Sequence, residues 1–272
     1  YEAGSWAAPV MEVSVGDGSA NPHDVVRCGD ELYVALYGTS FIHVYNPDTG
    51  LVVGAVDMSA FADSDGVNEV DALFCRGQSV FAVAQNLGLD WTSAGGMVLE
   101  IDTASKAVVN SHAVRANPRA HAHPTDESKL LLFSGHYGDG DGGLTEVDLS
   151  TGVESEVLLQ DADVGITFGG MAATERTLAI MGSTYDYSGT QVICVDLSDW
   201  STTDGMFIPG YTAAIGGDGA GMAWIGIPQE MAETGGPLEG STHGFQRFDI
   251  DACAAEGDVI PTNLQPYSLT FY

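Results

Sequence analysis

Two adjacent stretches show the pattern that runs through this chain: Asp30-Glu-Leu-Tyr-Val-Ala-Leu-Tyr-Gly38 and Phe41-Ile-His-Val-Tyr-Asn-Pro-Asp-Thr-Gly50. Each contains a short apolar run of the length typical of a β-strand, and the second ends in a cluster of turn residues. Side chains of Asn and Asp bond back to the turn backbone, and Gly adopts left-handed turn conformations without strain. The two stretches therefore predict antiparallel strands joined by short connections.

The same unit recurs along the chain. An acidic turn containing Ser, Thr or Gly follows an apolar run at each of Asp48, Asp102, Asp148, Asp196 and Asp249. Successive acids are 46 to 54 residues apart. A period of this size, built from several short strands, is typical of the blades of a β-propeller. The expected second strands of the repeats are 32–36, 80–84, 130–133, 178–181 and 222–225.

The repeats predict an all-β fold, a five-bladed β-propeller with four antiparallel strands in each blade, as a single domain over residues 1–272. The expected blades are 22–59, 67–114, 119–159, 166–208 and 213–257. Segment 10–15 precedes the first blade as a fourth strand would, so we expect it to close the ring as the outer strand of the last blade. Residues 258–272 remain as a terminal strand or tail, and six blades are the alternative.

The two opening stretches and their recurrence resemble the YVTN/NHL-like β-propeller repeats of exported bacterial proteins. The resemblance covers nearly the whole chain. It implies the propeller fold and an exported or cell-surface protein, but it implies no activity, because propellers host many functions.

Charge excludes several classes of partner. The 272 residues include 8 Lys and Arg against 38 Asp and Glu, which gives a net charge of -30, while 44% hydrophobic residues are ample for a core. The basic residues are scattered, so we expect no nucleic-acid partner. There is no apolar run long enough for a membrane helix, and we expect no direct membrane insertion. The first residue is Tyr1, as expected after cleavage of an export signal, and we expect an extracellular, cell-surface or periplasmic location.

The four cysteines fit the repeat. Cys28 and Cys75 fall at nearly equivalent first-to-second turns of adjacent blades. Cys194 lies on the third strand of the fourth blade, and Cys253 lies just past that strand in the fifth. The predicted disulfides are therefore Cys28–Cys75 and Cys194–Cys253, which implies an oxidising compartment. Four reduced thiols are the alternative.

Long loops are concentrated on one face of the predicted propeller. The loops between second and third strands, and those between blades, are long, acidic and aromatic, whereas the first-to-second turns are short. Binding residues concentrate on loops held by a rigid scaffold. The candidate ligand-binding residues are Asp90, Trp91, Tyr137, Tyr185, Tyr187 and Asp218. The alternative is that the acidic loops only keep the protein soluble.

Closely spaced carboxylates in these loops suggest a calcium site, because Ca²⁺ takes six to eight oxygen ligands from such loops. None of the loops completes an EF-hand pattern. The candidate ligands are Asp63, Asp65, Glu69, Asp139, Asp141, Asp161 and Asp163, and Ca²⁺ is the only expected cofactor.

Three histidines form a second candidate metal site. His121 and His123 alternate, so on a strand both side chains would face one side, and His23 has a comparable place in the first blade. First strands line the channel of a propeller, where imidazoles would suit Cu or Zn. The alternative is ordinary hydrogen bonding of each ring.

No catalytic residues are predicted, because the sequence has no nucleophile elbow, no H-E-x-x-H and no P-loop. We expect a non-enzymatic binding or assembly module of the cell surface, with other surface or envelope proteins or a glycan as partners. Assembly through the C-terminal strand would make the protein a structural subunit. The enzymatic alternative is a metal-dependent hydrolase or lactonase at the channel mouth.

Overall fold

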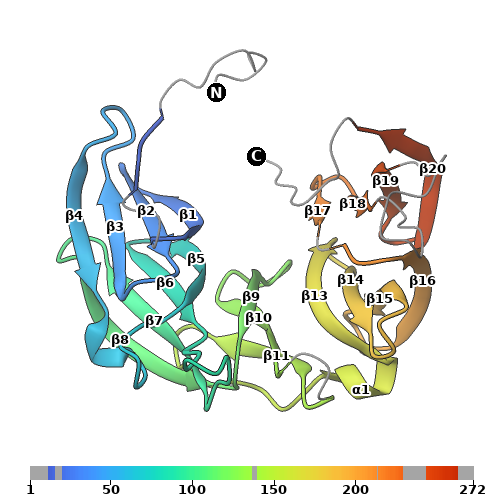
Figure 1. Ribbon diagram of the computed structural model, residues 1–272, viewed down its shortest axis with the longest axis horizontal. Coiled ribbons are helices and arrows are strands. Elements are labelled where there is room, and N and C mark those ends of the chain that lie inside the picture. The colour runs from blue at the N-terminus through green and yellow to red at the C-terminus, as the bar shows by residue number, and fades with distance from the viewer. Residues whose placement is uncertain (1–11, 16–19, 137–139, 213, 229–242, 263–272) are drawn as a thin grey trace. The chain divides into compact units, whose positions relative to one another are not determined.

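The computed structural model describes residues 12–15, 20–136, 140–212, 214–228 and 243–262. These residues form five antiparallel sheets of four strands each (Figure 1). Within each sheet the strands lie side by side in chain order, so every connection inside a sheet joins neighbours. This is the arrangement that the repeated strand–turn–strand pattern predicts.

Sheets 1 to 3 occupy the first part of the chain. Sheet 1 contains β1 (Pro22–Cys28), β2 (Glu31–Leu36), β3 (Phe41–Tyr45) and β4 (Val52–Asp57). Sheet 2 contains β5 (Val70–Arg76), β6 (Ser79–Ala84), β7 (Gly96–Asp102) and β8 (Ala107–Val114). Sheet 3 contains β9 (Arg119–Ala122), β10 (Lys129–Ser134), β11 (Gly143–Asp148) and β12 (Leu159–Gln160).

Sheets 4 and 5 follow. Sheet 4 contains β13 (Ile166–Ala173), β14 (Thr177–Thr184), β15 (Gly189–Asp196) and β16 (Thr202–Pro209). Sheet 5 contains β17 (Ile215–Gly217), β18 (Met222–Ile227), β19 (Gly244–Asp249) and β20 (Ala254–Pro261). Two single-turn helices, η1 (Ser59–Phe61) and α1 (Asp161–Val164), lie in the loops between sheets. The expected second strands all lie within β2, β6, β10, β14 and β18.

Burial explains the strand pattern. The second strands read as continuous apolar runs because both of their faces are covered, as in Leu130–Phe133, where every residue is buried. The fourth strands are more polar because they lie at the outer edge, as in β8 and β20, which are largely exposed.

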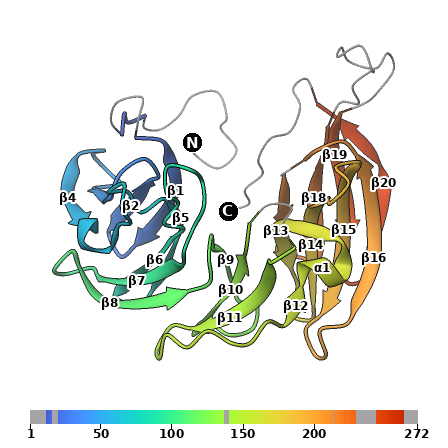
Figure 2. The same cartoon turned by 60° about the horizontal axis from the view of Figure 1, so that its bottom comes forward.

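The contacts divide the chain into two compact units. Unit 1 comprises 1–122, 127–135 and 146–155, and unit 2 comprises 123–126, 136–145 and 156–272. In unit 1, sheets 1 and 2 share a core that includes Tyr33, Ile42, Leu73 and Ile101. In unit 2, sheets 4 and 5 lie side by side around Met181, Ile225 and Phe248 (Figure 2).

Both predicted disulfides are present. Cys28 is bonded to Cys75, which links sheet 1 to sheet 2, and Cys194 is bonded to Cys253, which links sheet 4 to sheet 5. No cysteine is free. Each bond joins neighbouring sheets within one unit, as the equivalence of repeat positions predicts.

The recurring acidic turns are built by side chains that accept backbone hydrogen bonds. Oδ1 of Asp102 accepts from the N–H of Ser105 at 2.8 Å, and Asp196 accepts from Ser198 at 2.8 Å. In sheet 1 the equivalent residue is Asn46, because its Oδ1 accepts from the N–H groups of Asp48 and Thr49. The first turn is therefore formed by the Asn rather than by Asp48.

The outer strand of sheet 5 is β20, and this corrects the expected role of segment 10–15. The described residues of that segment, 12–15, form no strand, and Val13 and Val15 pack against Leu36 and other residues of sheet 1. A short turn joins β19 to β20, so this pairing closes a much smaller loop than pairing with a distant N-terminal segment would. Residues 258–261 of the expected tail belong to β20, and 263–272 lie outside the described residues.

Candidate functional site

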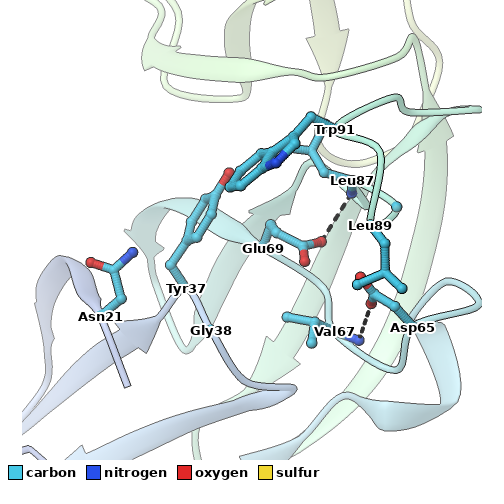
Figure 3. A pocket seen from close by; sticks show the side chains of 10 residues that line it. Asn21, Tyr37, Gly38, Asp65, Val67, Glu69, Leu87, Leu89 and Trp91 are labelled. Atoms are coloured by element: carbon cyan, nitrogen blue, oxygen red, sulfur yellow. Dashed lines mark hydrogen bonds between the residues drawn. The ribbon is translucent and has the colours of Figure 1, made fainter. Parts of the chain in front are cut away.

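A cavity of about 300 Å³ lies in unit 1, where β2 ends and the loops flanking β5 and β6 meet (Figure 3). Most of its lining is apolar or aromatic, with two carboxylates and one amide. The lining residues are Asn21, Tyr37, Gly38, Asp65, Val67, Glu69, Leu87, Gly88, Leu89 and Trp91. They come from four segments of the sequence: 21, 37–38, 65–69 and 87–91.

Two of these segments are joined by backbone hydrogen bonds. The pairing of β5 with β6 continues beyond the strands, because the N–H of Gln85 donates to the carbonyl of Glu69 at 3.1 Å. The N–H of Asn86 then donates to the carbonyl of Asn68 at 3.2 Å. The loop before β5 and the loop after β6 therefore form one rigid edge of the cavity.

Trp91 lies at the tip of the loop after β6. Its N–H donates to the carbonyl of Gly88 at 2.8 Å, and Gly88 in turn donates to the carbonyl of Thr92 at 2.9 Å. The side chain and backbone of Thr92 both donate to Asp90, which holds the pKa of that carboxyl below its ordinary value. The indole is 72% exposed, so this tight turn presents a large aromatic surface to solvent at the rim.

Tyr37 forms a fixed wall of the cavity. Its hydroxyl donates to Oε1 of buried Gln85 at 2.5 Å, and its ring lies 4.3 Å from that of His23. Burial, followed by the nearby charges of Asp71 and Glu69, raises the pKa of Tyr37 to about 12. The phenol therefore stays neutral at physiological pH.

Glu69 is the buried carboxyl of the site, with an exposed fraction of 7%. Its Oε2 accepts a 2.9 Å hydrogen bond from the N–H of Leu87, and no described residue donates to Oε1. Figure 3 shows the Glu69 side chain between Tyr37 and Leu87, with its carboxyl directed toward the Leu87 N–H and with Trp91 above it in this view. Burial raises the pKa of Glu69 to about 7, with a smaller contribution from the charges of Asp65 and Asp63.

Asp63 and Asp65 shape the loop before β5. Oδ1 of Asp63 accepts from the N–H of Asp65 at 3.0 Å, and Oδ1 of Asp65 accepts from the N–H of Val67 at 2.9 Å. The structure thus brings three of the candidate calcium ligands, Asp63, Asp65 and Glu69, into one region, where the first two form turns. Asp63 and Asp90 also line a neighbouring hollow of about 380 Å³.

The other candidate calcium ligands lie in unit 2. Asp141 accepts from the N–H of His136 at 2.9 Å and lies 3.1 Å from its ring nitrogen. Asp161 is buried at the start of α1, which raises its pKa, and Asp163 is exposed. Asp139 lies outside the described residues. Across the described ranges, no group of three or more His, Cys, Asp or Glu side chains is arranged to hold a metal ion. Calcium binding stays a prediction.

The candidate histidines each have a local neighbour. The His23 ring lies 3.5 Å from a carboxyl oxygen of Asp71. The ring of His121 packs edge-on against Phe133, and burial, with the charge of Arg119, lowers the pKa of His121 to about 4. His123 accepts from the N–H of Thr125 at 3.3 Å. The structure places these rings in ordinary packing and hydrogen-bonding contacts.

The remaining candidate ligand-binding residues do not line the cavity. Asp218 accepts from the N–H of Ala220 at 2.8 Å and so shapes a turn, and Tyr187 is exposed. Tyr185 lies beside Asp161, and Tyr137 is outside the described residues. Sequence reasoning missed Tyr37 and Leu87. The available signal was their position in the second-to-third loops of their repeats, the same loop class that contains Trp91.

Comparison with known proteins identifies the architecture. No protein-family model and no curated protein matches this sequence. The structure is similar to hydrazine synthase of Kuenenia stuttgartiensis, with a TM-score of 0.63 and 11% identity, covering 96% of this chain and 73% of that one. It is also similar to the Dos1 propeller, with a TM-score of 0.52 and 10% identity, covering 91% and 71% of the two chains.

A chain of the nidogen–laminin complex is similar as well, with a TM-score of 0.52 and 12% identity, covering 89% of this chain and 81% of that one. The fold is a β-propeller. At these identities the likeness shows the propeller fold alone, and the five four-stranded sheets agree with five blades. None of the helices in the described part of the propeller has the length and apolarity needed to cross a membrane.

Proposed function

We propose that this propeller is a binding module that works outside the cytoplasm and recognises another surface or envelope protein at the cavity of unit 1. The cavity itself carries the proposal. Its apolar and aromatic lining, with a few placed polar groups, is the composition typical of ligand sites, and its volume suits one inserted side chain. The two disulfides support an oxidising compartment.

The rim of the cavity favours a protein partner. Trp91 and Leu89 are 72% and 88% exposed, and large apolar side chains held in place at a surface are typical anchors of protein interfaces. The turn that presents Trp91 is closed by backbone hydrogen bonds, so little conformational entropy would be lost on binding. This arrangement suits recognition better than catalysis, because the described lining offers Glu69 as its one buried carboxyl.

A peptide array and a glycan array, each probed with labelled protein, test the proposal. The wild type should bind a subset of peptides, and Trp91→Ala should lose that binding. Leu51→Ala, which removes an exposed apolar side chain of the turn between β3 and β4 that does not line the cavity, is the matched control and should bind normally. Binding to glycans alone, or peptide binding that survives Trp91→Ala, would overturn the proposal. Repeating the assay with calcium chloride and with EDTA checks the calcium expectation.

A further inference from the structure

The backbone conformation of Glu69 is unusual for its residue type. Four positions spaced 48 residues apart, each just before the first strand of a sheet, have positive φ: Asn21, Glu69, Asn117 and Gly165, at 45°, 45°, 52° and 73°. Gly adopts this conformation freely and Asn tolerates it, whereas Glu does so rarely. Sheet 2 therefore has a carboxylate where the equivalent positions have residues that suit the backbone.

The loop does not need a carboxylate for its own closure. In sheet 3 the equivalent Asn117 donates from Nδ2 to the carbonyl of Gly135 at 3.1 Å, and Gly135 lies 48 residues after Leu87. In sheet 3 a neutral amide thus joins the two loops that correspond to those joined in sheet 2 by Glu69 and the N–H of Leu87. Compared with Asn117, Glu69 adds a negative charge and an Oε1 atom that accepts no hydrogen bond from a described residue. Both belong to a side chain that lines the cavity.

We propose that the cavity binds an organic cation, the ammonium or guanidinium group of a lysine- or arginine-like side chain, between the Glu69 carboxyl and the aromatic faces of Tyr37 and Trp91. Carboxylates form strong charge-assisted hydrogen bonds with both groups. Aromatic faces attract cations, and the attraction increases when the cation is partly desolvated. This inference rests on the proposed function and names the chemistry of the group that enters the cavity.

The lining complements such a ligand along its whole length. It contains Glu69 and Asp65 and no Lys, Arg or His. Val67, Leu87 and Leu89 supply apolar surface for an aliphatic stem, which long basic side chains bury readily. The net charge of -30 would also draw cationic ligands toward the protein at low salt.

Proton release supplies an independent readout. The pKa of Glu69 is raised to about 7, and the charged groups that act on it are Asp65 and Asp63, while the Leu87 N–H lowers the pKa. The neutral phenol of Tyr37, the residue after β2, is the other titratable group with an aromatic ring in the lining, and the charges of Asp71 and Arg119 act on that phenol. An entering cation favours the charged carboxylate, so binding below about pH 7 should release a proton from Glu69.

The direct test is calorimetric titration with Nα-acetyl-lysine methylamide and Nα-acetyl-arginine methylamide at pH 8. The neutral analogue Nα-acetyl-norleucine methylamide should bind at least about tenfold more weakly. Glu69→Gln keeps an acceptor for Leu87 and should lower the affinity for the cations by at least about tenfold. Titration at pH 6 in buffers of different ionisation enthalpy should show proton release by the wild type and none by this variant.

Asp48→Asn is the matched control, since it makes the same change in net charge at an exposed carboxylate of unit 1 that does not line this cavity. It should bind the cations normally. If Glu69→Gln does not fold, judged by near-UV circular dichroism, the exposed Trp91→Ala serves instead and should also weaken binding. Putrescine and a lysine-containing peptide distinguish a free amine from a protein side chain as the source of the cation.

Equal binding of the norleucine analogue, or an equal loss in Asp48→Asn, would overturn the cation inference. The two proposals fail in different ways. Trp91-dependent binding of peptides that lack Lys and Arg would refute the cation and leave the binding module standing. If Trp91-dependent binding is found for none of the arrayed peptides and none of the three amides, both proposals are wrong.

Discussion

The backbone N–H of Leu87 donates a 2.9 Å hydrogen bond to Oε2 of Glu69, and this contact joins the loop before β5 to the loop after β6. Sheet 3 joins the equivalent loops with Asn117 and Gly135, through a neutral side chain. Equivalent positions of the repeat therefore join the loops before the first strand and after the second strand in two ways, with a carboxylate in sheet 2 and with an amide in sheet 3. Only the one in sheet 2 leaves an ionisable oxygen facing a cavity.

Stability should depend on pH through Glu69. Because its pKa is raised from 4.5 to about 7, the folded state holds this proton more tightly than the unfolded chain does. The contribution is fully present below about pH 4.5 and is lost as pH rises through about 7. Glu69→Gln should therefore gain stability relative to wild type between pH 5 and pH 8, on the order of 1 kcal/mol after allowing for water in the cavity.

Urea denaturation of both proteins at pH 5 and pH 8 measures this difference. Asp90→Asn is the control, because the pKa of Asp90 is lowered and its charge does not change in that range. A stability difference between wild type and Glu69→Gln that is the same at both pH values would contradict the prediction.

The acidic turn at Asp148 should lose its stabilising effect at low pH. Oδ1 of Asp148 accepts from the hydroxyl and N–H of Ser150 and from the N–H of Thr151, and these bonds lower its pKa to about 2. Its stabilisation is present above pH 3.8 and is lost as pH falls toward 2. Asp148→Ala should lower the thermal midpoint at pH 7 and change it little at pH 2. Asp148→Asn, which can still accept, should lie between wild type and Ala at pH 7.

Gly152 should not tolerate a side chain. Its φ is +68°, and an added Cβ would lie 1.7 Å from Nδ1 of His112 on β8. Gly152→Ala should destabilise the protein by about 2 to 4 kcal/mol, from the left-handed backbone and from displacement of the imidazole. Gly29→Ala is the control, because φ is +61° there but no atom lies within 4 Å. It should cost only about 1 kcal/mol. Equal midpoints in urea for the two variants would refute the steric argument.

Each disulfide should stabilise the contact between two neighbouring sheets. Cys28–Cys75 closes a separation of 47 residues and Cys194–Cys253 one of 59. Replacing either pair by serine should cost roughly 2 to 5 kcal/mol of unfolding free energy, since the unfolded chain regains loop entropy. Non-reducing peptide mapping of the wild type should recover the 28–75 and 194–253 cross-links and no alkylated cysteine. Any peptide that links Cys28 to Cys194 would contradict this pairing.

Local and repeated features could be predicted from the sequence. The apolar runs of the second strands, the acidic turns and the equivalence of the cysteine positions depend on neighbouring residues and on the period, so they identified five blades and both disulfides. Where two neighbouring residues could both form the same turn, the sequence pattern did not show which of them does so. Asn46 and Asp48 can both form an Asx turn, and only the backbone geometry shows that Asn46 does so.

Contacts between distant segments were decided by the tertiary structure. The outer strand of sheet 5 depends on whether a nearby or a distant segment pairs with β19, and the shorter loop prevailed. The sequence identified Glu69 only as one of seven candidate calcium ligands. Folding places it against Leu87 and beside Tyr37 and Trp91, out of bulk water, and this desolvation turns an ordinary surface carboxylate into a titrating group in a cavity. Hydrophobic periodicity determines which residues are buried, but only the packed fold determines which neighbours they meet.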